Sequence, residues 1–108
     1  MGVAMIDLVQ QKRDAIADLA RAYGVSTLDI FGSAATGAFN EESRTSDIDF
    51  IVEFADMSPG IANRYLDFAG ALERLLGRPV DLMFDGPISN PYLRHSVQLS
   101  RERVFVAG

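Results

Sequence analysis

The sequence predicts an α/β (α+β) domain in which a small mixed sheet of three to four strands has helices packed against it. Apolar residues recur at helical spacing in long segments, and short β-prone runs alternate with those segments along the chain. The 108 residues contain no internal repeat and no linker long enough to separate two units. We therefore expect one domain over residues 1–108, with the order α-β-α-β-α-β-α and a short fourth strand after the last helix.

The N-terminal part begins with a predicted helix that ends at Gly24, where glycine can adopt a left-handed conformation. The apolar stripe of this helix consists of Met5, Val9, Ile16, Leu19, Ala20 and Tyr23. Residues 27–31 form a β-prone run, and residues 34–37 are long enough for only a short helix. The polar residues 38–46 are predicted to form a loop.

The middle of the chain contains a predicted strand over residues 47–54 and a second long helix. Side chains alternate along a strand, so one face of this strand is apolar, with Ile48, Phe50, Val52 and Phe54. Ser58 is expected to cap the helix with Pro59 at its first position, and Gly77 is expected to end it. The apolar stripe of this helix is Ile61, Tyr65, Phe68, Leu72, Leu75 and Leu76.

The C-terminal part is predicted to hold a third strand at residues 79–84. Asn90, followed by Pro91, is a typical cap for a further helix that runs to about Ser100. Residues 104–106 are expected to form the short last strand.

Composition restricts the chemistry of any bound metal. The chain has no cysteine and one histidine, His95, which we interpret as a surface or packing residue. A metal must therefore be held by oxygen ligands, which favours Mg²⁺. The net charge of −5 argues against direct nucleic-acid binding, and no apolar run reaches membrane-spanning length. Without a signal-peptide pattern at the start, we expect a soluble, cytoplasmic protein.

The candidate metal ligands are Asp47 and Asp49, which lie two positions apart and therefore on the same face of the predicted strand. At about 4 Å and an effective dielectric constant of about 20, two such carboxylates repel each other by about 4 kcal/mol. A divalent cation would relieve this repulsion, as in phosphoryl and nucleotidyl transfer. The alternative is a pair of acids that simply face solvent at the start of a strand.

Two further features accompany this acid pair. Gly32-Ser33 follows a strand, where a glycine lets the backbone approach a phosphate and the Ser33 hydroxyl can donate to it. Asp81 lies within the apolar third strand. It joins the same cluster if that strand pairs with the strand that carries Asp47 and Asp49. The alternatives are an ordinary Gly-Ser turn and an edge-strand Asp81 that faces water.

Four segments together resemble the minimal nucleotidyltransferases of the DNA polymerase β superfamily. They are residues 28–37 (LDIFGSAATG), 46–54 (SDIDFIVEF), 77–83 (GRPVDLM) and 91–94 (PYLR). The resemblance implies a polymerase-β-like fold and ATP- and Mg²⁺-dependent nucleotidyl transfer. It assigns phosphate binding to Gly32 and Ser33, metal binding to Asp47 and Asp49, and the completion of a catalytic triad to Asp81.

The family's minimal members commonly act as antitoxins that bind a HEPN-type ribonuclease toxin and modify it with AMP. The resemblance therefore implies AMP transfer to a hydroxyl of such a toxin and a hetero-oligomer with it. Two departures affect substrate handling: Ala34 and Thr36 stand where the family usually has arginines, and the stretch 34–46 is longer than usual. Arg44 could supply the missing positive charge or be a solvated loop residue. An antitoxin that acts by contact alone, and nucleotidyl transfer to a small molecule, are the alternative functions.

Overall fold

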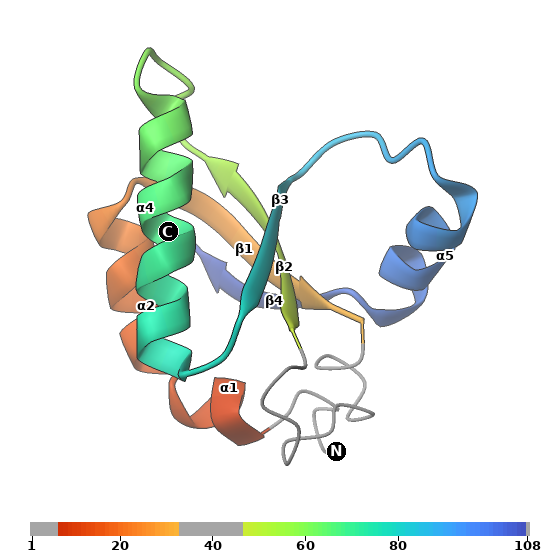
Figure 1. Ribbon diagram of the computed structural model, residues 1–108, viewed down its shortest axis with the longest axis horizontal. Coiled ribbons are helices and arrows are strands. Elements are labelled where there is room, and N and C mark those ends of the chain that lie inside the picture. Colours follow the sequence, from red (N-terminus) through yellow and green to blue (C-terminus); the bar gives the residue numbers. More distant parts are fainter. Residues whose placement is uncertain (1–6, 33–46, 108) are drawn as a thin grey trace.

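The computed structural model describes residues 7–32 and 47–107, and its centre is a four-stranded mixed sheet (Figure 1). The strands are ordered β3-β2-β1-β4. Their bounds are β1 Val25–Phe31, β2 Ile48–Phe54, β3 Val80–Phe84 and β4 Glu102–Val106. β1 runs antiparallel to β2 and β4, whereas β2 and β3 are parallel. The predicted small mixed sheet is thereby confirmed.

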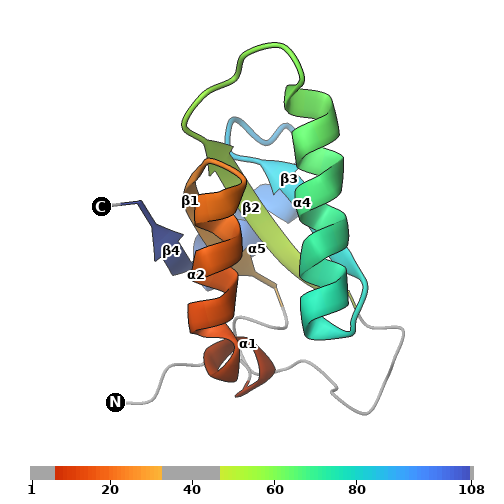
Figure 2. The same ribbon diagram turned by 90° about the vertical axis from the view of Figure 1, so that its left-hand side faces the viewer.

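The described helices lie on both faces of this sheet. α2 (Arg13–Ala22) and α4 (Ile61–Leu76) cover one face side by side, and the short α1 (Asp7–Gln11) precedes α2 (Figures 1 and 2). α5 (Pro91–Ser100) lies on the opposite face. Within the described part of the chain, no helix is both long and apolar enough to cross a membrane.

The main hydrophobic core lies between the sheet and the pair α2 and α4. The even-numbered apolar residues predicted for β2 are all buried there: Ile48, Phe50, Val52 and Phe54. A smaller cluster on the opposite face joins Phe31, Ile51 and Val97, so that α5 covers the middle of that face. Because Asp49 shares a face with Ile51, it lies on the α5 side of the sheet, beyond this cluster.

Three of the predicted helix ends are confirmed, two by a left-handed glycine and one by a side-chain cap. Gly24 and Gly77 have φ values of +74° and +67°, and each follows the last turn of a helix. The side-chain oxygen of Asn90 accepts hydrogen bonds from the amides of Tyr92 and Leu93, at 2.9 and 3.1 Å.

The predicted start of the second long helix is wrong by two residues. The amide of Ser58 donates to Asp56 Oδ1 at 3.0 Å, and the carbonyl of Ser58 accepts from the Ile61 amide at 3.2 Å. These bonds make a turn that Gly60 closes with φ +96°, and α4 begins at Ile61 without a side-chain cap. The predicted first helix is also divided, since α1 and α2 are separated at Lys12. The predicted short helix 34–37 and loop 38–46 lie outside the described residues.

Candidate active site

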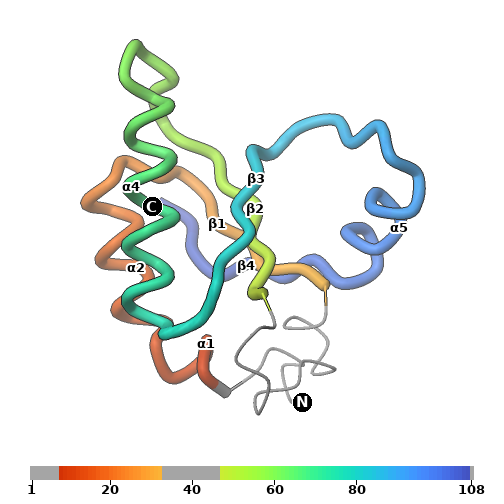
Figure 3. The backbone as a smooth tube through the Cα atoms, in the orientation of Figure 1, coloured from red at the N-terminus to blue at the C-terminus, as the bar shows by residue number. Residues whose placement is uncertain are grey.

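The end of β1 and the starts of β2 and β3 meet at one end of the sheet, as the backbone trace shows (Figure 3). Phe31, the last residue of β1, pairs with Asp49, and Asp49 pairs on its other side with Asp81. Gly32, which directly follows Phe31, therefore lies next to this row, where β1 ends beside the two acids. The structure thus places β3 beside the strand that carries the Asp47-x-Asp49 pair, as the sequence reasoning required.

The carboxyl group of Asp49 is partly buried at this end of the sheet. Partial burial raises its pKa from 3.8 to about 6, with smaller contributions from the negative charges of Asp81 and Asp47. Asp47 and Asp81 themselves are exposed. Asp47 and Asp81 therefore both lie within electrostatic reach of the Asp49 carboxyl group, and a cation would lower the pKa of Asp49.

The acids fit a magnesium ion that is shared with phosphate better than one held by protein alone. Among residues 7–32 and 47–107, no group of three acidic or histidine side chains is arranged to hold a metal as it stands. Mg²⁺, however, is commonly bound by one or two carboxylates together with substrate phosphates and water. Asp49 and Asp81, opposite each other on parallel strands, are suited to such a site, with Asp47 at its exposed side.

Gly32 lies close to the carboxylate of Asp49. Its φ of +75° favours glycine, and a Cβ atom placed on it would lie 2.8 Å from Oδ2 of Asp49. Its amide donates to the hydroxyl of Ser100 at 2.8 Å. Glycine is thus needed here for its backbone angle and for the closeness of the Asp49 carboxylate. Ser33, Ala34, Thr36 and Arg44 lie outside the described residues.

Sequence reasoning did not single out Ser100 or Asp29. Ser100, at the end of α5, is buried and lies three positions after the buried Val97, so helical periodicity alone could have placed it facing inward. Asp29 is a buried acid inside the apolar β1, and both of its oxygens accept from guanidinium groups, those of Arg101 and Arg103. An acid within an apolar strand signals a required partner, but not which residue supplies it.

Arg101 connects this buried acid to the end of β3. It also binds the carboxylate of Asp85 through both terminal nitrogens, at 3.3 and 2.8 Å. The hydrogen bond to Asp85 is the largest of the effects that raise the pKa of Arg101, and Asp29 adds to it. The junction between α5 and β4 is therefore tied to both β1 and the end of β3.

Tyr65 and His95 are two further titratable residues, and neither is part of the acid cluster. The Tyr65 hydroxyl of α4 donates to the carbonyl of Leu82, and its pKa is raised by burial and by the charge of Asp81. His95 is exposed on α5, in agreement with its interpretation as a surface residue.

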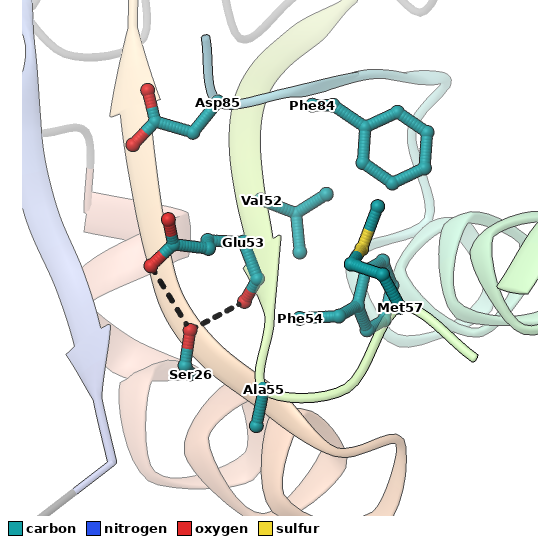
Figure 4. A pocket seen from close by; sticks show the side chains of 8 residues that line it. All are labelled: Ser26, Val52, Glu53, Phe54, Ala55, Met57, Phe84 and Asp85. Atoms are coloured by element: carbon teal, nitrogen blue, oxygen red, sulfur yellow. Dashed lines mark hydrogen bonds between the residues drawn. The ribbon is translucent and has the colours of Figure 1, made fainter.

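A cavity of about 480 Å³ lies at the opposite end of β2 from the acids (Figure 4). Its walls are mostly apolar, with the exposed side chains of Met57 and Phe84. The carboxylates of Glu53 and Asp85 lie on its other side, and Ser26 donates to the Glu53 carbonyl at 3.0 Å. The cavity contains none of the three candidate metal ligands, so it is a separate feature of the surface.

A glycine turn beside two paired acids, at one end of a four-stranded mixed sheet, is the arrangement expected of a nucleotidyltransferase. A family model described as "Nucleotidyltransferase domain" matches residues 11–104. A protein of Methanocaldococcus jannaschii named "putative protein adenylyltransferase" is 38% identical over 76 residues, which is 70% of this chain and 73% of that protein. The chain therefore belongs to the nucleotidyltransferase-domain family.

Solved structures agree with this assignment. One described as a "putative minimal nucleotidyltransferase" has a TM-score of 0.68 and 29% identity, over 90% of this chain and 95% of that chain. A chain in a crystal structure of a toxin-antitoxin with AMP-PNP has a TM-score of 0.65 and 26% identity, over 88% of this chain and 73% of that chain. The predicted polymerase-β-like nucleotidyltransferase fold is confirmed.

The raised pKa of Asp49 predicts how the metal-free domain responds to pH. Because the folded-state value of about 6 exceeds the ordinary 3.8, the folded protein binds this proton more tightly than the unfolded chain. The favourable contribution is fully present below about pH 4 and is lost as the pH rises through 6. The difference corresponds to about 3 kcal/mol, which solvent screening around a half-buried group reduces to about 1–2 kcal/mol.

We therefore expect Asp49→Asn to stabilise the metal-free domain by about 1–2 kcal/mol at pH 7.5 and by almost nothing at pH 4. Urea unfolding of the variant and the parent, both with a chelator present, measures this difference at each pH. Equal stabilities at pH 7.5 would show that the ionised Asp49 carboxylate does not destabilise the metal-free domain.

Proposed function

We propose that this nucleotidyltransferase transfers AMP from ATP to a hydroxyl group of a partner protein. The observation that carries the proposal is that Asp49 and Asp81 pair on adjacent strands and that Gly32, just after β1, lies close to the Asp49 carboxylate. It is supported by the related protein named as a protein adenylyltransferase and by the AMP-PNP in the similar toxin-antitoxin structure.

Each candidate residue has a role in this proposal. Asp47, Asp49 and Asp81 hold Mg²⁺, which when bound neutralises charge on the phosphates. Gly32 and Ser33 hold the phosphates of ATP. Asp81, which is exposed, also orients the acceptor hydroxyl and takes its proton. The hydroxyl oxygen attacks the α-phosphorus, the bond from that phosphorus to the bridging oxygen breaks, and pyrophosphate leaves.

The proposed partner is a HEPN-type ribonuclease toxin in the cytoplasm, which this chain neutralises as its antitoxin. A ribonuclease must present a basic surface to RNA, and the net charge of −5 attracts such a surface. The exposed Met57 and Phe84, beside the carboxylate of Glu53, provide apolar and acidic contact area for a basic protein.

The test is to incubate the chain with the protein encoded next to it, together with ATP and Mg²⁺, and to weigh that neighbour by intact-protein mass spectrometry. We expect one or more added AMP units, and none with Asp47→Asn. A neighbour that is bound and inhibited but unmodified would instead identify an antitoxin that acts by contact. A neighbour that does not associate would remove the toxin as partner and leave transfer to a small molecule as the remaining reaction.

A further inference from the structure

The buried hydroxyl of Ser100 forms a hydrogen bond between α5 and the residue that follows β1. Its oxygen donates to the carbonyl of Ser96 at 2.6 Å, one helical turn earlier. The hydroxyl proton is committed to that bond, so a lone pair on the same oxygen is free to accept from the Gly32 amide at 2.8 Å. The two bonds fix the orientation of the hydroxyl and, through it, the peptide plane that enters Gly32.

The position of Ser100 is itself fixed from both sides. Val97, one turn earlier, packs against Phe31 and Ile51 on the sheet. Arg101, the next residue, is held by Asp29 and Asp85. A hydroxyl held between two such contacts is a rigid acceptor. If the Gly32 amide turned away from it, a half-buried N–H group would lose its hydrogen-bond partner.

Gly32 in turn lies against the carboxylate that faces Asp81. Since a Cβ atom on Gly32 would reach within 2.8 Å of Asp49 Oδ2, a small rotation of this turn changes the space around that carboxylate. The Gly32 amide itself is bonded to Ser100, so Gly32 contributes to the site through the shape of this turn.

We propose that Ser100 is a positioning residue for nucleotide binding: its hydroxyl orients the Gly32 turn against Asp49 so that the phosphates of ATP can be received. This inference rests on the proposed function in its use of ATP. It extends the site to α5, an element that carries none of the candidate ligands.

The test compares Ser100→Ala with Ser100→Thr, which restores a hydroxyl, and with Ser96→Ala. Ser96 is exposed on the same helix, and its substitution keeps the backbone carbonyl that Ser100 uses. Two quantities are measured for each: hydrogen exchange of the Gly32 amide by NMR without nucleotide, and the affinity for Mg-ATP by calorimetry.

We expect Ser100→Ala to speed exchange of the Gly32 amide at least about tenfold and to weaken Mg-ATP binding about five- to tenfold, the range of one lost hydrogen bond. Ser100→Thr should recover much of both, and Ser96→Ala should change neither. Unchanged Gly32 exchange in Ser100→Ala would overturn the proposal, as would faster exchange with undiminished ATP affinity, which would make the bond purely structural.

Neither measurement requires AMP transfer. A parent protein that binds Mg-ATP but modifies no partner would therefore contradict the proposed function. The role of Ser100 would still be decided by the exchange of the Gly32 amide and the affinity for Mg-ATP. If Ser100→Ala and Ser100→Thr both lost structure throughout, seen as changes across the amide spectrum, a specific positioning role for Ser100 would likewise be overturned.

Discussion

Replacing Asp49 by Asn is expected to lower the rate of AMP transfer by roughly a thousandfold, the scale seen when a preorganised charge is removed from a transition-state site. Asp49 is the central acid of the candidate site, since it pairs with Asp81 on the neighbouring strand and lies close to the Gly32 turn. Asparagine keeps the shape of the side chain but loses the negative charge that a divalent cation requires. The rate is measured as AMP incorporated into the partner, or as pyrophosphate released.

Asp67→Asn is the matched control for this substitution. Asp67 is exposed on α4, away from the acid cluster, so the same change there should leave transfer at the parental rate. Since Asp49→Asn is also expected to stabilise the metal-free domain, a loss of transfer cannot be attributed to unfolding. A fully active Asp49→Asn variant would remove Asp49 from the catalytic site.

The strands and their faces were predictable because their signal is local. In β2 the alternation of apolar and acidic residues alone assigned Phe50 to the core and Asp49 to the other face. Helix ends at Gly24 and Gly77 were equally predictable, since a left-handed residue there favours glycine. The start of α4 was not, because the Asp56 side chain captures the amide of Ser58 and a turn replaces the expected cap.

The acids of the candidate site were predictable from the sequence, but the hydrogen bonds that hold the surrounding elements in place were not. Asp81 could be placed beside Asp49 only on the condition that their strands pair, and the parallel register meets that condition. The bonds from Asp29 to Arg101 and from Gly32 to Ser100 join residues 72 and 68 positions apart. No local pattern encodes such distant partners, although buried polar groups in apolar segments indicate that partners exist.

Gly32→Ala is expected to reduce AMP transfer at least about a hundredfold and to destabilise the domain. Alanine carries a cost of about 1–2 kcal/mol at a left-handed backbone position. At Gly32 it also adds a methyl group 2.8 Å from Asp49 Oδ2, closer than a carbon and an oxygen can approach without displacement. Either the carboxylate or the turn must shift, and the alignment of the phosphate site with the acid pair is lost. Transfer to the partner and the midpoint of thermal unfolding are the two measurements.

Gly77→Ala separates these two effects. Gly77 has a similar φ of +67°, but a Cβ atom there would meet nothing within 4 Å. This variant should therefore lose stability only through the strained backbone conformation. We expect a lower unfolding temperature and, below that temperature, a parental transfer rate. The difference in transfer between Gly32→Ala and Gly77→Ala then measures the contact with Asp49. If the two variants lost stability equally and both kept full transfer, the closeness of Gly32 to the Asp49 carboxylate would have no part in the reaction.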